Sequence, residues 1–110
     1  MKRFDIVLYL GTSYSATIFL DDIDLSSGYT AELKIKEHPL YDDVIFSTDT
    51  DEYITLTEQG ELKIEIPHDA EGIPLINGIY DCIMTNTDTG EKSLVIFGYY
   101  YPNILASSPS

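Results

Sequence analysis

The sequence predicts an all-β fold, an antiparallel sandwich, because short stretches rich in β-branched and aromatic residues recur with turn residues between them. In residues 29–36, Tyr, Ala, Leu and Ile alternate with Thr, Glu and Lys, and residues 61–66 show the same two-residue period. Successive side chains of a strand point to opposite faces, so each of these strands has one apolar face for a core and one charged face for water. All five prolines fall in predicted loops, at strand ends or near the C-terminus.

The first half of the chain is predicted to form five strands. They are Phe4–Leu10, Tyr14–Leu20, Tyr29–Lys36, Val44–Ser47 and Tyr53–Thr57. The first two are separated by Gly11-Thr12-Ser13, and a three-residue loop containing Gly predicts a β-hairpin. The loop at 37–42 contains Pro39, which fits the end of the third strand.

The second half adds a strand at 61–66, which follows a short turn and ends before Pro67 because proline has no N–H for a ladder. Residues 68–76 are expected to form one short helical turn. The last two strands, Ile79–Asn86 and Ser93–Tyr101, bracket a hairpin signal at 88–90. Seven or eight short strands with turns between them are typical of an antiparallel sandwich or a small barrel. Of the two we expect an antiparallel, immunoglobulin-like β-sandwich of about seven or eight strands. We expect a single domain at 1–105 and a polar C-terminal tail at 106–110.

The alternating pattern assigns Tyr29, Ala31, Leu33 and Ile35 to the core. Full burial of a leucine side chain contributes about 1.5–3 kcal/mol to folding. A carboxylate at position 33 would therefore be placed among apolar side chains, and we expect Leu33→Asp to prevent folding.

Charge restricts the classes of partner. The chain has 19 acidic and six basic residues, a formal net charge of −13. Nucleic acids and anionic lipid surfaces repel such a protein, because their binding depends on Lys and Arg. Apolar runs such as residues 6–10 are too short to span a membrane. A basic protein partner, or simple solubility at high local concentration, remain as the two interpretations.

The sequence gives little sign of catalytic or metal-binding chemistry. His38 and His68 lie in predicted loops beside proline, and Cys82 lies within a predicted strand, where a thiol packs as a small hydrophobe. The acidic clusters at 21–24 and 49–52 offer oxygen ligands for calcium but lack the spacing of an EF-hand loop, and turn formation explains them more simply. We expect a protein without enzymatic activity, cofactor or metal.

Aromatic residues are the remaining candidates for a site. Nine of the thirteen are tyrosines, and Tyr99, Tyr100 and Tyr101 are consecutive at the end of the last predicted strand. Because adjacent positions face opposite ways, at least one of the three is expected to be exposed. Tyrosine is favoured at protein interfaces, so these three are the candidate partner-binding residues. Tyrosine rings also stack on sugars, which keeps a carbohydrate-binding module as an alternative. The three tyrosines are equally compatible with a tyrosine-rich rim of the sandwich that binds no partner.

Four segments, in order, resemble a known group of proteins. They are FDIVLYLGTSYSATIFL (4–20), IDLSSGYTAELKIK (23–36), GELKIEIP (60–67) and NGIYDCIMTNTDTGEKSLVIFGYYY (77–101). Together they resemble the small β-sandwich structural domains of tailed-bacteriophage virion proteins of the neck, tail or baseplate type, and they are similar to the first domain of baseplate upper proteins.

This resemblance implies a non-enzymatic structural subunit of a tailed-phage virion, assembled in the host cytoplasm and located in the head–tail neck, tail or baseplate. Its implied partners are tail, neck, fibre or capsid subunits, in a symmetric assembly that holds several copies. Edge strands such as Phe4–Leu10 or Leu94–Tyr101 are expected to extend a partner's sheet. The alternatives are a carbohydrate- or host-surface-binding module and a capsid decoration protein.

Overall fold

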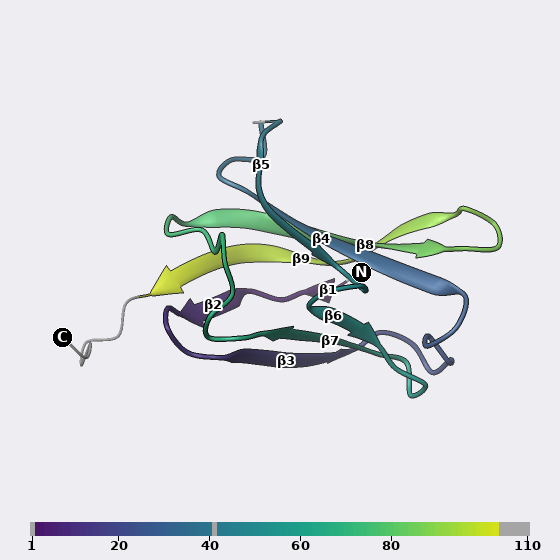
Figure 1. Ribbon diagram of the computed structural model, residues 1–110. Coiled ribbons are helices and arrows are strands. Elements are labelled where there is room, and N and C mark those ends of the chain that lie inside the picture. The colour runs from purple at the N-terminus through teal and green to yellow at the C-terminus, as the bar shows by residue number, and fades with distance from the viewer. Residues whose placement is uncertain (1, 41, 104–110) are drawn as a thin grey trace.

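The computed structural model describes residues 2–40 and 42–103 (Figure 1). In this part of the chain there are nine strands and no helix. The strands are β1 (Lys2–Arg3), β2 (Ile6–Tyr9), β3 (Tyr14–Phe19), β4 (Tyr29–Lys36), β5 (Val44–Asp49), β6 (Ile54–Leu56), β7 (Glu61–Ile66), β8 (Gly78–Asn86) and β9 (Lys92–Asn103). The all-β class is confirmed. The predicted tail at 106–110 lies outside the described residues.

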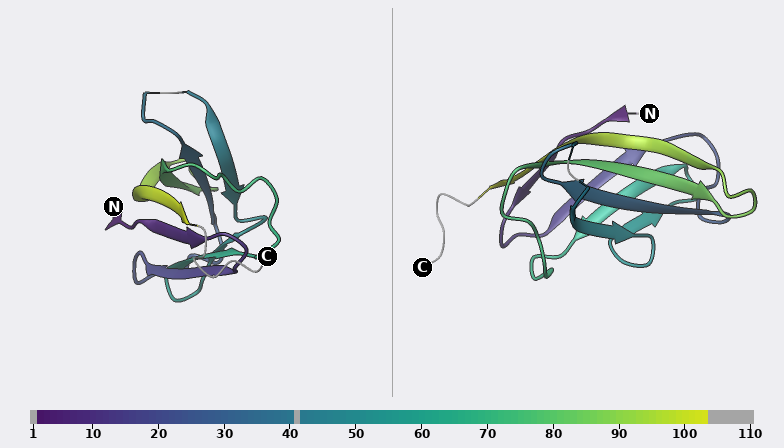
Figure 2. Two further views of the ribbon diagram at one scale, coloured as in Figure 1. Left: turned by 90° about the vertical axis from the view of Figure 1, so that its left-hand side faces the viewer. Right: turned by 90° about the horizontal axis from the view of Figure 1, so that it is seen from above.

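Two sheets enclose the core. The larger one, sheet A, has six strands in the order β1-β9-β8-β4-β5, with β2 also paired to β9. The smaller one, sheet B, has the order β3-β7-β6. Figures 1 and 2 show the two sheets as separate layers, with the β4–β5 connection projecting away from the outer side of sheet A. The number of strands exceeds the expected seven or eight, partly because β1 and β2 are separate.

The hairpin predicted at Gly11-Thr12-Ser13 is wrong. Strand β2 belongs to sheet A and β3 to sheet B, so this loop carries the chain from one sheet to the other. The alternating apolar residues of both strands are still buried. Ile6 and Leu8 of β2 enter the core from sheet A, and Ile18 of β3 enters it from sheet B. Two strands that face each other across a core bury their apolar faces as well as two that lie side by side.

The antiparallel prediction also fails at the N-terminus, because β1 and β2 both pair with β9 in parallel. Strand β9 consequently lies between β8 and the β1–β2 segment, and the expectation that Leu94–Tyr101 forms an edge is wrong. The β8–β9 hairpin itself is as predicted, with one register shift between Cys82 and Ile83. The parallel pairing joins the beginning of the described chain to its end.

Three of the four core positions predicted in residues 29–36 are confirmed. Ala31, Leu33 and Ile35 are buried, and Tyr29 is half-buried, while the intervening residues of β4 face water except for the half-buried Lys36. Residues from both sheets form one hydrophobic cluster: Ile6, Leu8, Ile18, Leu25, Ala31, Leu33, Ile35, Ile54, Leu56, Leu62, Ile64, Ile66, Tyr80, Cys82, Ile96 and Tyr100. Removal of this apolar area from water is the main stabilising term of the fold.

The short helical turn expected at 68–76 is not confirmed. The segment makes tight turns, one of them closed by a hydrogen bond from the Ala70 N–H to the Pro67 carbonyl, 3.1 Å long. Among the described residues no helix is long and apolar enough to cross a membrane.

The link between β1 and β2 is held tightly against β9. The Phe4 N–H donates to the Phe97 carbonyl (2.8 Å), and the Tyr80 hydroxyl donates to the Phe4 carbonyl. Gly98 makes this approach possible, since a Cβ there would lie 2.4 Å from the Phe4 carbonyl oxygen. A glycine in β9 is therefore a packing requirement for the N-terminal segment.

Candidate docking surface

The three consecutive tyrosines of β9 have different environments. Tyr99 is 44% exposed, Tyr101 is half-buried and Tyr100 is 1% exposed. Tyr100 points into the core, where its hydroxyl donates to the Pro74 carbonyl (2.8 Å) and burial raises its pKa to about 12. The expectation that at least one of the three is exposed is confirmed. In this fold only Tyr99 and Tyr101 are placed to contact a partner.

Tyr99 is held in place by its neighbours. Its ring stacks on that of Tyr101, with centroids 5.8 Å apart and planes 25° apart, and the Arg3 guanidinium lies 5.1 Å from the Tyr99 centroid. The Tyr99 N–H donates to Asp5 Oδ1 (3.0 Å), and this hydrogen bond holds the pKa of the Asp5 carboxyl below its usual value. Arg3 Nε also lies 3.5 Å from Asp5 Oδ1. An aromatic side chain fixed in this way loses little conformational entropy on binding.

Strand register extends this site across the outer side of sheet A. Tyr99 pairs with Ile79, and Tyr101 pairs with Val7, so their side chains share a face. The apolar residues that share it, from β2, β8 and β9, form what we call the outer-face patch: Val7, Tyr9, Ile79, Ile83, Leu94, Phe97, Tyr99 and Tyr101. The run of tyrosines was the only part visible in the sequence, because the other members come together through pairings between distant strands.

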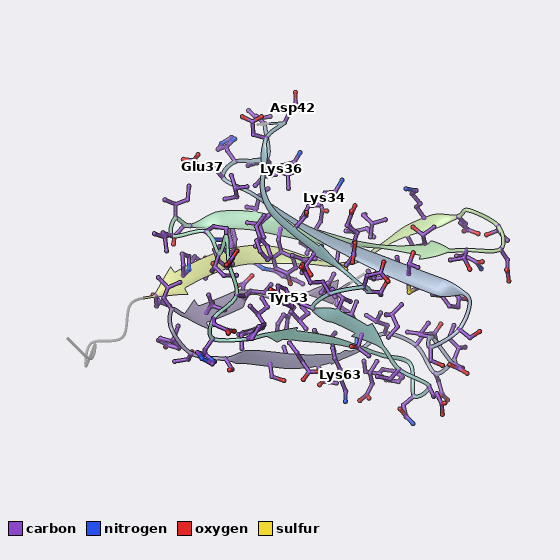
Figure 3. The ribbon with its side chains drawn as sticks, viewed as in Figure 1. Lys34, Lys36, Glu37, Asp42, Tyr53 and Lys63 are labelled. Atoms are coloured by element: carbon purple, nitrogen blue, oxygen red, sulfur yellow. The ribbon has the colours of Figure 1, made fainter. Side chains whose placement is uncertain are left out.

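Charged side chains border the outer-face patch on β4. Lys36 and Lys34 pair with Ile79 and Asp81 of β8, and Lys34 Nζ lies 3.3 Å from Glu32 Oε1. Figure 3 shows Lys34 and Lys36 near the projecting β4–β5 tip, and Lys63 on the opposite sheet. Four of the six basic residues lie on this side of the molecule: Arg3, Lys34, Lys36 and Lys92. This face is therefore less acidic than the rest of the surface.

Two hollows lie on this side of the molecule. One is lined by the β4 charges together with Val44, Ile79 and Ile83, and the next by Arg3, Leu94, Phe97 and Tyr99. Half of the residues that line the second hollow belong to the outer-face patch. Such a surface offers contact area for another molecule.

The groups considered for chemistry have local structural partners. Asp24 Oδ1 accepts hydrogen bonds from the Ser26 N–H (2.8 Å) and hydroxyl (2.5 Å), which lower its pKa, and Asp49 Oδ1 accepts the Asp51 N–H (2.9 Å). These are turn contacts. Burial raises the pKa of the Cys82 thiol to about 12. In residues 2–40 and 42–103 no cluster of three or more His, Cys, Asp or Glu side chains is arranged to hold a metal ion.

Neither histidine belongs to the outer-face patch. His38 Nδ1 accepts the Leu40 N–H (3.1 Å) in the β4–β5 connection, and His68 lines a small hollow with Leu8, Ile66 and Ile73.

No protein-family model matches the chain, and no curated protein matches it.

Proposed function

We propose that this protein is a non-enzymatic structural subunit of a tailed-phage virion, and that it docks to neighbouring virion proteins through the outer-face patch. The observation that carries the docking proposal is the group of aromatic and aliphatic side chains that three strands present together on one open sheet face. The virion assignment rests on the resemblance of the four sequence segments. Assembly takes place in the host cytoplasm, and the protein is then part of the particle.

The composition of the patch favours protein contact. Val7, Tyr9, Leu94 and Tyr99 are each more than one third exposed, and they lie on the same face as the half-buried Phe97. Contiguous apolar surfaces on soluble proteins mark interaction sites. Tyrosine and arginine contribute much of the binding energy at protein interfaces, and Tyr99 with Arg3 supplies both in one fixed arrangement.

The charge distribution favours docking of the subunit in one orientation on a basic neighbour. The net charge of −13 draws the subunit towards more basic neighbours, while the outer-face patch meets them with apolar side chains and a border of lysines. Like charges over most of the remaining surface disfavour non-specific self-association. Several copies in a symmetric neck, tail or baseplate would thus be kept soluble until they dock.

We infer an immunoglobulin-like topology for the domain. In that fold one sheet has the strand order B-E-D next to A, and the other has G-F-C with C′ added in variable-type domains. The orders β3-β7-β6 and β9-β8-β4-β5 correspond to these two sheets. Tyr80 stands two residues before Cys82 on the strand that corresponds to F, which is the position of the tyrosine in a tyrosine corner. Its hydroxyl, however, donates to the carbonyl of Phe4, far away along the chain, and not to a carbonyl a few residues upstream.

The test is the protein inventory of purified particles, determined by mass spectrometry and followed by immunogold labelling. We expect the wild-type chain in the particle, at the neck, tail or baseplate. Leu94→Asp, within the patch, should reduce incorporation at least about tenfold, because a carboxylate in an apolar interface loses its hydration. Leu75→Asp is the matched control, since Leu75 is exposed in the 67–77 connection, outside the patch, and should be incorporated normally.

Three outcomes would overturn the proposal. A particle without this chain would remove the virion role. Labelling on the head surface would make it a capsid decoration protein. Saturable binding in a glycan array that Tyr99→Ala abolishes would make it a carbohydrate- or host-surface-binding module.

A further inference from the structure

The sheets have four free edges, and three of them carry features that hinder the addition of another strand. Strand β6 has only three residues, and β5 has a register shift opposite Ile35 and Lys36. The edge formed by β1 and β2 is interrupted at Phe4 and Asp5 and begins with two basic residues. Short strands, bulges and charged side chains are the usual protections of an edge.

Strand β3 lacks these protections. Its six residues, Tyr14–Phe19, contain no charge and no proline, and they pair with β7 without any register shift. Strand β7 is its only neighbour in sheet B. Three of its outward side chains are exposed: Ser15, Thr17 and Phe19, the last by 50%. An edge of this kind is open to a further strand.

The backbone groups at this edge can be identified from the pairing. The Leu20 N–H donates to the Gly60 carbonyl (2.9 Å), and on the far side of β7 the Glu65 N–H donates to the Tyr53 carbonyl. Bonding alternates along an antiparallel strand, so the even-numbered residues of β3 face β7. Ser15, Thr17 and Phe19 therefore direct their N–H and C=O groups to the free edge.

We propose that a second copy of this chain pairs with β3 across a two-fold axis, so that the two B sheets become one continuous six-stranded sheet. The interface is isologous, with Thr17 of one copy opposite Thr17 of the other. The same register places Phe19 opposite Ser15 and Ile18 opposite Ala16. Each pair joins a large side chain with a small one, and the two threonines can exchange a hydrogen bond.

The complementary side-chain pairs of β3 favour a second copy at this edge, and charge within the interface does not exclude it. Two chains of net charge −13 repel each other, and acids lie on most of the surface. The proposed register brings no acid against another: Asp21, just beyond β3, meets Ser13 of the other copy. The nearby cation is Lys2, whose Nζ lies 5.6 Å from the Phe19 ring centroid. Among the charge interactions, dimerisation is thus opposed only by long-range repulsion, which salt screens, so salt should strengthen it.

The first test is analytical ultracentrifugation of the intact protein. We expect a monomer–dimer equilibrium that shifts towards dimer as NaCl is raised from about 0.05 M to about 0.5 M, because the screening length shortens. Thr17→Lys should raise the dimer dissociation constant about tenfold, since two like charges would then lie opposite each other. Thr55→Lys is the matched control: Thr55 and Thr17 are both exposed and both pair with Lys63, but on opposite sides of β7.

A second test reports the register. Residues opposite each other in a bonded antiparallel pair have Cα atoms about 5.5 Å apart, within the range of a disulfide. Under mild oxidation Thr17→Cys should form a covalent dimer. Ser15→Cys should not, because in this register the two equivalent positions lie about 13 Å apart. The natural thiol, Cys82, is buried and does not compete.

The proposal is independent of the outer-face patch, and Leu94→Asp should leave the dimer intact. A chain that stays monomeric at every salt concentration would overturn it. Equal weakening by Thr17→Lys and Thr55→Lys, with both variants folded by circular dichroism, would do the same. Loss of Thr17→Lys from particles, in a chain that is otherwise monomeric, would assign the edge to another protein and refute the second-copy interface.

Discussion

Replacement of Gly98 by alanine tests how the N-terminal segment is attached to β9. The new methyl carbon would lie 2.4 Å from the Phe4 carbonyl oxygen and 2.8 Å from its carbon. Both are backbone atoms, so no side-chain rotation relieves the overlap. Phe4 must retreat by about 1 Å to reach ordinary van der Waals separation.

This displacement breaks two hydrogen bonds that involve Phe4. One runs from its N–H to the Phe97 carbonyl, and the other from the Tyr80 hydroxyl to its carbonyl. Each contributes about 1 kcal/mol net, so Gly98→Ala should lower the free energy of unfolding by about 2 kcal/mol. For a domain of this size the corresponding fall in Tm is about 10 °C.

Urea denaturation followed by circular dichroism measures the effect, together with a double-mutant cycle that includes Tyr80→Phe. If Gly98→Ala already breaks the Tyr80–Phe4 bond, then Tyr80→Phe should destabilise the Gly98→Ala background much less than the wild type. Strict additivity of the two substitutions would refute this reasoning. A Gly98→Ala protein within about 0.5 kcal/mol of wild type would refute it as well.

Three further predictions concern the core and two titrating groups. Leu33→Asp should abolish cooperative unfolding and near-ultraviolet circular dichroism, and a well-folded variant would contradict the burial of Leu33. The folded-state pKa of Asp5 is lowered, so its contribution is complete above the unfolded pKa and is lost as pH falls through the folded pKa; Asp5→Asn should therefore flatten the acid limb of a stability–pH curve. The pKa of Cys82 is raised from 9.0 to about 12, so stability falls as pH rises through this interval, and Cys82→Ala should show a shallower alkaline decline than wild type.

The alternating strands were predictable because each position's burial follows from a period of two. The pattern in β4 and β7 therefore assigned the right residues to the core. The same pattern does not indicate which strands are neighbours in a sheet. A three-residue loop with Gly fits both a hairpin and a connection between sheets, and only the pairing of β2 with β9, far along the chain, distinguishes them.

The candidate site shows the same limit. Alternation along β9 predicted that neighbouring tyrosines face opposite sides of the sheet. Which of them lies on the outer face depends on where the strand starts and on the bulge opposite Ile83. Tyr100 therefore belongs to the core, although its sequence neighbours do not. The outer-face patch depends on the registers of β2 and β8 against β9, and these are tertiary pairings that local sequence does not encode.

The parallel alignment of β2 with β9 has a mechanical consequence. Tension applied through Lys2 at one end and Asn103 at the other pulls these two strands along their length in opposite directions. The rungs between Ile6–Tyr9 and Tyr100–Asn103 are then loaded together in shear, whereas a terminal hairpin would peel open one rung at a time. Rupture must break them collectively, so the domain is built to transmit a pulling force along its length before it extends.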